Sequence, residues 1–204
     1  MLAGMLADAA AGPPRATLAY LAGDSYPLDA RIEGAVRHAF AGAALRWIGQ
    51  REGLAGERFT SEPQHRLAAL ARAVGDTPRE RLWLLGRSSG IRLATRHAVD
   101  HPVAGVIGFG YPFEAPGVGP EPERVAHLAR LRVPTLIVQG ERDRYGGRAL
   151  AGRLDLSPSI EFLWVDADHE LRLAPAGWLA VLAQVRAFAA RHGLALRTAQ
   201  EAAG

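Results

Sequence analysis

Short apolar runs alternate with longer segments of helical period along this chain, and this alternation most strongly constrains its fold. Several runs are apolar on both faces, as strands covered by helices on both sides must be. The alternation predicts an α/β fold with a minimal, mostly parallel sheet of six strands and helices on both faces. The expected strands are Ala16–Leu21, Ala43–Ile48, Leu82–Leu85, Val103–Phe109, Thr135–Val138 and Ile160–Val165. The expected helices are Asp29–Phe40, Pro63–Val74, Ser89–Asp100, Glu121–Leu131, Gly147–Leu154 and Pro175–His192.

Length and composition limit what such a sheet can carry. The 204 residues, 49% of them hydrophobic, suffice for one domain with a substantial core but not for a second full domain. We therefore predict a single domain over residues 15–204, active as a monomer or homodimer, after a disordered start at residues 1–14. Cysteine and lysine are both absent, which excludes thiolate metal sites, disulfide scaffolds, cysteine nucleophiles and lysine Schiff bases. We expect no metal and no cofactor.

The basic residues give little indication of a macromolecular partner. All 24 are arginines spread along the chain, and the net charge is only +3. We interpret them as solvated surface rather than as a nucleic-acid footprint. No window of 18 apolar residues lacks a charge, and the first residues lack the basic region of a secretory signal. The sequence thus predicts a cytoplasmic protein that binds neither nucleic acid nor membrane.

One motif between an expected strand and an expected helix suggests nucleophilic chemistry. Gly86-Arg87-Ser88-Ser89-Gly90 has the pattern G-x-S-x-G. A nucleophilic serine needs a very sharp strand-to-helix turn with strained backbone, and the flanking glycines let neighbouring segments approach closely. The motif predicts Ser88 as nucleophile and the backbone N–H of Ser89, at the helix N-terminus, as an oxyanion donor. The competing interpretation is a glycine-rich turn in which Ser89 merely caps the helix.

Two later expected strands end in loops that carry an acid and a histidine. Asp143 follows Thr135–Val138, with Glu141 as a competing acid, and His169 follows Ile160–Val165. Each of these residues taken alone is more often structural than catalytic. The order serine, acid, histidine after successive strands is nevertheless that of α/β-hydrolases. In that arrangement His169 would deprotonate Ser88, and Asp143 would orient the imidazole.

The same segments carry a resemblance to a known family. The chain resembles the small α/β-hydrolases of the dienelactone-hydrolase-like type, in the compact branch that includes testis-expressed and chromatin-complex hydrolase-like proteins. The resemblance covers roughly residues 16–190 and rests on Gly86–Gly90, on Gly108-Phe109-Gly110-Tyr111-Pro112-Phe113, on Pro134–Asp143 and on Asp168-His169. It implies the α/β-hydrolase fold, with Ser88 as nucleophile, Asp143 as acid and His169 as base.

The chain departs from this family after the first strand. Relatives carry a His-Gly pair there, and a backbone N–H completes the oxyanion hole. Here the corresponding stretch is Ala22-Gly23-Asp24-Ser25, so the donor becomes the backbone N–H of Asp24. A carboxylate beside a developing oxyanion is unfavourable unless it is paired or points away. We expect Arg87 to pair with it.

Further residues are expected around the pocket. Arg87 and the arginines flanking Asp143 place positive charge near the site, for fold-stabilising pairing or for an anionic substrate. Tyr111, Pro112 and Phe113 are expected to wall the pocket, because aromatic residues often do so at strand ends. No long insertion supplies a large lid.

These observations lead to competing functions. The first is a serine hydrolase that cleaves a small ester or thioester through an acyl-enzyme. The alternative is a non-catalytic or weakly active interaction protein on a hydrolase scaffold with a degraded oxyanion loop, since fold alone does not establish activity. A nucleic-acid-associated protein is a third hypothesis, which rests only on arginine content.

Overall fold

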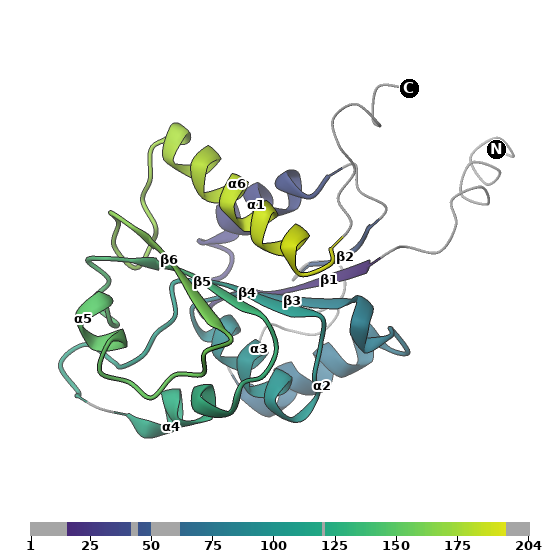
Figure 1. The fold of residues 1–204 in the computed structure, drawn as a ribbon, viewed down its shortest axis with the longest axis horizontal. Coiled ribbons are helices and arrows are strands. Elements are labelled where there is room, and N and C mark those ends of the chain that lie inside the picture. Colours follow the sequence, from purple (N-terminus) through teal and green to yellow (C-terminus); the bar gives the residue numbers. More distant parts are fainter. Residues whose placement is uncertain (1–15, 42–44, 50–61, 120, 195–204) are drawn as a thin grey trace, which may run out of the picture.

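A parallel sheet organises the structure, a computed structural model that describes residues 16–41, 45–49, 62–119 and 121–194. Within these residues six strands lie in the order β2-β1-β3-β4-β5-β6 (Figure 1). Every neighbouring pair is parallel. The strands are β1 (Ala16–Leu21), β2 (Leu45–Ile48), β3 (Leu82–Arg87), β4 (Gly105–Phe109), β5 (Thr135–Gly140) and β6 (Ile160–Val165). The predicted fold class is thereby confirmed.

Helices cover both faces of this sheet (Figure 1). They are α1 (Ala30–Ala39), α2 (Pro63–Val74), α3 (Ser89–Asp100), α4 (Pro122–Val125), α5 (Arg148–Ala151) and α6 (Pro175–Arg191), with 3-10 helices at Arg79–Arg81 and Ala126–Arg130. Helices α1 and α6 lie together on one face, whereas α2, α3 and α4 lie on the other. None of the described helices is long and apolar enough to cross a bilayer.

Two apolar layers hold the helices to the sheet. One joins Leu70 of α2 and Ile91 and Ala94 of α3 to strand residues such as Leu84. The other joins α1 and α6 to the opposite sheet face, and it includes a perpendicular contact between the rings of Trp83 and Phe188, 6.3 Å apart. Removal of so many apolar side chains from water is the main driving force for this packing.

The predicted elements differ from the observed ones mainly at their ends. Strand β3 continues to Arg87, because its ladder with β4 extends to the pair Arg87 and Phe109. The helix expected over Glu121–Leu131 is divided into α4 and a 3-10 helix, where Val125 leaves helical geometry at φ −124°. Helix α6 buries Val185 and Phe188 but leaves the side chain of Leu179 71% exposed. The expected disordered start at residues 1–14 lies outside the described residues.

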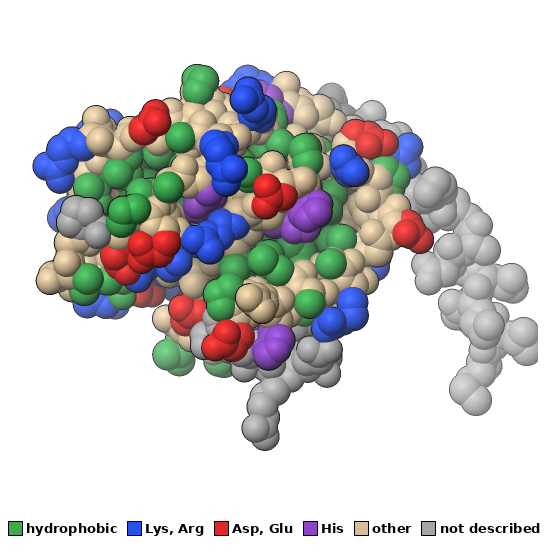
Figure 2. Space-filling model, turned by 90° about the horizontal axis from the view of Figure 1, so that it is seen from below, with side chains coloured by type: hydrophobic (Ala, Val, Ile, Leu, Met, Phe, Trp, Pro, Cys, Tyr) green, Lys and Arg blue, Asp and Glu red, His purple; other side chains and the backbone are tan. Residues whose placement is uncertain are grey.

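Charged side chains of both signs are interspersed on the face that α2, α3 and α4 cover (Figure 2). Apolar and histidine side chains lie between them. This mixed pattern differs from the continuous basic stripe that is typical of nucleic-acid-binding surfaces.

Candidate functional site

The candidate site lies where the strands of the parallel sheet end. The loops after β1, β3, β5 and β6 carry Asp24, Ser88, Asp143 and His169, respectively. Because parallel strands all end at one edge, the topology alone brings these four loops together.

Ser88 occupies a sharp turn between β3 and α3. Its backbone has φ 51° and ψ −119°, a conformation that costs a residue with a side chain of order 1–3 kcal/mol. The predicted strain at Ser88 is therefore confirmed. A Cβ atom at Gly86 would lie 2.5 Å from Ile91 N, and one at Gly90 would lie 2.1 Å from Leu21 O. Only glycine fits at these two positions, which explains the flanking glycines of the motif.

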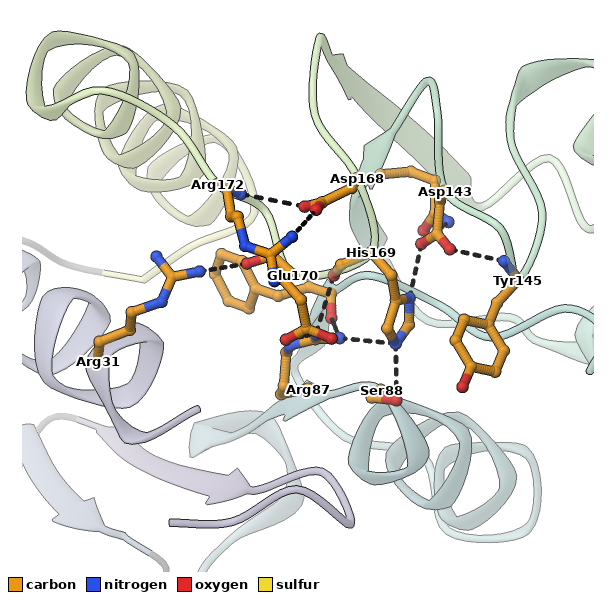
Figure 3. Close-up of polar contacts among 11 residues, drawn as sticks. Arg31, Arg87, Ser88, Asp143, Tyr145, Asp168, His169, Glu170 and Arg172 are labelled. Carbon is orange, nitrogen blue, oxygen red and sulfur yellow. Dashed lines mark hydrogen bonds and ion pairs between the residues drawn. The ribbon is translucent and has the colours of Figure 1, made fainter. Parts of the chain in front are cut away.

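A continuous chain of hydrogen bonds joins the serine, the histidine and the aspartate (Figure 3). Ser88 Oγ lies 3.0 Å from His169 Nε2, and His169 Nδ1 lies 2.8 Å from Asp143 Oδ2. His169 and Asp143 are buried, whereas Ser88 is partly exposed. The arrangement can pass a proton from the serine hydroxyl to the imidazole, and it can stabilise the imidazolium that results.

The carboxylate of Asp143 is held by three donors. Besides His169, Gln139 Nε2 donates to its Oδ2 at 2.9 Å, and the Tyr145 N–H donates to its Oδ1 at 2.8 Å. Glu141, the competing acid, instead forms an exposed ion pair with Arg148 at 2.6 Å. Of the two acids only Asp143 is positioned to orient the imidazole.

Arg87 lies behind the histidine rather than in a pocket wall. Its side chain is 2% exposed. One guanidinium nitrogen, Nη2, donates to the His169 carbonyl at 2.8 Å and pairs with Glu170 at 3.3 Å, while Nη1 lies 3.2 Å from His169 Nε2. The expectation that Arg87 lines the pocket was wrong, since β3 directs this side chain beneath the loop that carries His169.

The carboxylate of Asp24 is compensated by partners other than Arg87. It accepts a hydrogen bond from Ser89 Oγ at 2.7 Å and pairs with Arg66 of α2 at 3.4 Å. Arg66 also donates to the carbonyl of Ala22. Burial lowers the pKa of the Arg66 guanidinium, and the carboxylates of Asp24 and Asp29 act against this shift. The expected pairing of Asp24 with Arg87 is therefore wrong.

Two backbone N–H groups next to Ser88 are candidate oxyanion donors. Ser89 is the first residue of α3, so its N–H has no partner within the helix. After β1, the turn is closed by the N–H groups of Tyr26 and Leu28, and no backbone carbonyl of the described residues accepts the Asp24 N–H. A Cβ atom at Gly23 would lie only 3.1 Å from Ser88 Cβ, so glycine lets this loop approach the serine.

The aromatic residues expected in the pocket wall lie elsewhere. Tyr111 is fully buried in the core, and its hydroxyl donates to the Arg124 carbonyl at 2.6 Å. Burial raises the pKa of the Tyr111 hydroxyl well above its usual value. Pro112 is buried as well, and Phe113 lines a separate cavity with Pro122 and Val125. The expectation for Tyr111 was wrong, because the segment after β4 places its side chain in the apolar layer with α2 and α3.

Sequence reasoning missed two residues that position the site. Gln139 is fully buried at the end of β5, where it bonds both to Asp143 and to the backbone of Tyr111. A buried amide in an otherwise apolar strand is a signal that could have revealed it. Arg66 lies on a helix distant in sequence, and no local pattern links it to Asp24. Among the described residues, no three His, Asp or Glu side chains are grouped as metal ligands.

Comparisons with known proteins agree with this architecture. Residues 49–177 match the alpha/beta hydrolase domain family. The esterase domain of a Rhodothermus marinus protein has the same fold, with a TM-score of 0.63 at 20% identity over 87% of this chain and 88% of that chain. No curated protein matches the sequence.

Two further solved structures share the fold at low identity. A thioesterase domain from the curacin biosynthetic pathway has a TM-score of 0.61 at 13% identity, over 86% of this chain and 92% of that one. A Xanthomonas campestris protein, described as a serine hydrolase without a lid, has a TM-score of 0.60 at 16% identity, over 92% of this chain and 87% of that one. Because the family match spans more than half of the sequence, the chain belongs to the alpha/beta hydrolase domain family.

Proposed function

We propose that this protein is a serine hydrolase that cleaves a small ester or thioester through an acyl-enzyme. The observation that carries the proposal is the hydrogen-bonded chain Ser88–His169–Asp143 at the carboxyl edge of the sheet. A serine hydroxyl is a poor nucleophile at its ordinary pKa, so it needs an adjacent base of this kind.

The residues of the site then divide the steps of the reaction among them. His169 Nε2 takes the proton of Ser88 as Oγ attacks the carbonyl carbon, and Asp143 stabilises the resulting imidazolium. The tetrahedral oxyanion is held by the N–H groups of Ser89 and Asp24. Collapse breaks the bond to the alcohol or thiol, which leaves with the proton from His169. Water, activated by the same imidazole, then hydrolyses the acyl-Ser88 ester.

The environment of Asp24 favours turnover over the non-catalytic alternative. An unpaired carboxylate would oppose a developing oxyanion. Here the carboxylate of Asp24 is compensated by Arg66 and bonded to Ser89 Oγ. Its backbone N–H remains available to the oxyanion, so the loss of the family's histidine does not by itself disable the loop.

The structural neighbours are consistent with this chemistry. Their descriptions include an esterase domain, a thioesterase domain and a serine hydrolase without a lid. The narrower resemblance to dienelactone-hydrolase-like proteins remains a prediction from the sequence motifs.

Labelling with a fluorophosphonate probe tests the proposal directly. The wild-type protein should be labelled at Ser88, and Ser88→Ala should abolish labelling. Ser159→Ala is the matched control, because Ser159 bonds the Leu131 carbonyl at the opposite end of β6. Absence of Ser88-dependent labelling in protein shown by circular dichroism to be folded would favour the interaction-protein hypothesis. Turnover of 4-nitrophenyl acetate and of S-ethyl thioacetate then distinguishes ester from thioester preference.

A further inference from the structure

A charged cavity opens beside His169. Its volume is about 550 Å³, and its lining includes four arginines, Arg31, Arg142, Arg144 and Arg172, together with Asp168 and Glu170. They come from α1 and from the loops after β5 and β6, the same loops that carry Asp143 and His169. A cavity of this size suits a small molecule.

Part of the positive charge in this cavity is neutralised within the protein. Arg142 pairs with Asp166. Arg172 pairs with Asp168 (Figure 3). Glu170 is also occupied, because its carboxylate lies 3.3 Å from Arg87 Nη2. None of these carboxylates remains to compensate the other two arginines of the lining.

Arg31 and Arg144 have no carboxylate partner among the described residues. Arg31 donates to the backbone carbonyl of Glu170 (Figure 3), a contact that positions the guanidinium but leaves its charge uncompensated. Arg144 lies over the ring of Tyr145, 5.2 Å from its centroid, and that ring packs against the His169 ring at 4.3 Å. Two uncompensated guanidinium groups thus line a cavity whose wall includes the histidine of the site.

We propose that Arg31 and Arg144 bind an anionic substituent of the substrate, so that the preferred esters are negatively charged. The inference rests on the proposed hydrolase function and adds the substrate class. Guanidinium groups suit this role because they stay charged at all working pH values and donate several hydrogen bonds to an oxyanion such as a carboxylate. His169 lies in the wall of this cavity and is hydrogen-bonded to Ser88 Oγ, so an anion held there lies on the histidine side of the site.

The test compares esters that differ only in charge. Mono(4-nitrophenyl) adipate and the 4-nitrophenyl ester of adipamic acid carry a carboxylate or a carboxamide on the acyl side. The pair 4-acetoxybenzoate and 4-acetoxybenzamide carries the same difference on the leaving group. We expect kcat/KM to favour the anionic member of at least one pair by about tenfold at low salt. The preference should shrink as ionic strength rises, because both arginines are exposed to screening.

Arginine substitutions assign the preference to the cavity. Arg144→Gln and Arg31→Gln should each lower kcat/KM for the anionic ester about three- to tenfold and leave the neutral ester within twofold. Arg132→Gln is the matched control, since Arg132 is an exposed arginine preceding β5, at the opposite edge of the sheet, and it should change neither.

The outcomes separate this inference from the function on which it rests. Ser88-dependent hydrolysis without a charge preference in either pair would overturn the anionic-substrate inference and leave the hydrolase proposal standing. A charge preference that Arg31→Gln and Arg144→Gln both leave intact would also overturn it. Absence of Ser88-dependent labelling and of turnover in folded wild-type protein would instead overturn the hydrolase proposal.

Discussion

Arg87 Nη1 lies 3.2 Å from His169 Nε2, the same ring nitrogen that lies 3.0 Å from Ser88 Oγ. A guanidinium group only donates hydrogen bonds, so Nε2 acts as the acceptor. The ring proton of neutral His169 therefore resides on Nδ1, where it is donated to Asp143. This is the tautomer that general-base catalysis by Nε2 requires. The second residue of the G-x-S-x-G motif thus orients the histidine in addition to flanking the serine.

Substitution of Arg87 should disturb the loop that carries His169. Arg87→Met keeps much of the side-chain volume but removes the bonds to the His169 carbonyl and to Glu170. We expect a loss of about 1–3 kcal/mol in the free energy of unfolding and at least tenfold slower fluorophosphonate labelling of Ser88. Urea denaturation and labelling kinetics measure the two effects. Unchanged labelling in a destabilised variant would show that Arg87 supports the fold without orienting His169.

Replacement of the acid should separate Asp143 from its neighbour Glu141. Asp143→Asn keeps the size of the side chain but presents either its amide N–H₂ group or a weaker acceptor to His169 Nδ1. We expect kcat to fall about 10³- to 10⁴-fold, with little loss of folded protein. Glu141→Gln, which breaks only the exposed pair with Arg148, should leave kcat within twofold. Equal losses in both variants would contradict the assignment of the acid.

Gly90 in the serine turn and Gly34 on α1 offer a matched pair of substitutions that tests the packing of this turn. Gly90→Ala would place a methyl carbon 2.1 Å from Leu21 O and 2.6 Å from Ala22 O. We expect it to lower the free energy of unfolding by about 3 kcal/mol or to prevent folding, because backbone atoms must move. Gly34→Ala adds the same methyl group on α1, where nothing lies within 4 Å, and should stabilise the protein by about 0.5–1 kcal/mol. Thermal and urea unfolding of the two variants check that Gly90→Ala lowers the free energy of unfolding and that Gly34→Ala raises it.

A buried histidine outside the site should make stability depend on pH. Burial, with Arg96, Arg92 and Arg130 nearby, lowers the pKa of His127 to about 4. Its Nε2 lies 2.9 Å from Thr95 Oγ1, and its Nδ1 has no partner among the described residues. Between this folded value and an unfolded pKa of about 6.5, the proton binds mainly to the unfolded chain. The stabilisation is therefore complete above that pH and is lost as pH falls toward the folded value.

The corresponding experiment compares unfolding at two pH values. Between pH 7 and pH 5 the wild type should lose about 2 kcal/mol more stability than His127→Gln, at about 1.4 kcal/mol for each unit of pKa difference. Urea denaturation of both proteins at both pH values isolates this contribution, because the other titrating groups are common to them. Parallel losses in the two proteins would show that His127 does not remain neutral in the folded state.

Much of the fold could be predicted from local sequence patterns. The ranges expected for β1, β6, α2 and α3 coincide with the observed bounds. They could be predicted because the spacing of apolar residues, and the residue types at helix ends such as Pro63, directly reflect backbone geometry. Element ends were less predictable where pairing decides them. Strand β3 extends as far as it pairs with β4. Its end therefore depends on the neighbouring strand and not only on its own sequence.

The sequence by itself determined the strand–helix alternation, the glycine-flanked serine turn and the chain order of Ser88, Asp143 and His169. These features depend on near neighbours along the chain, which periodicity and short motifs report. Only the tertiary structure decided between Asp143 and Glu141, turned Arg87 toward His169, buried Tyr111 in the core and brought Arg66 to Asp24. These outcomes depend on which side chains meet across loops and helices far apart in sequence. Burial and charge compensation at those contacts select one arrangement among several that the local patterns permit.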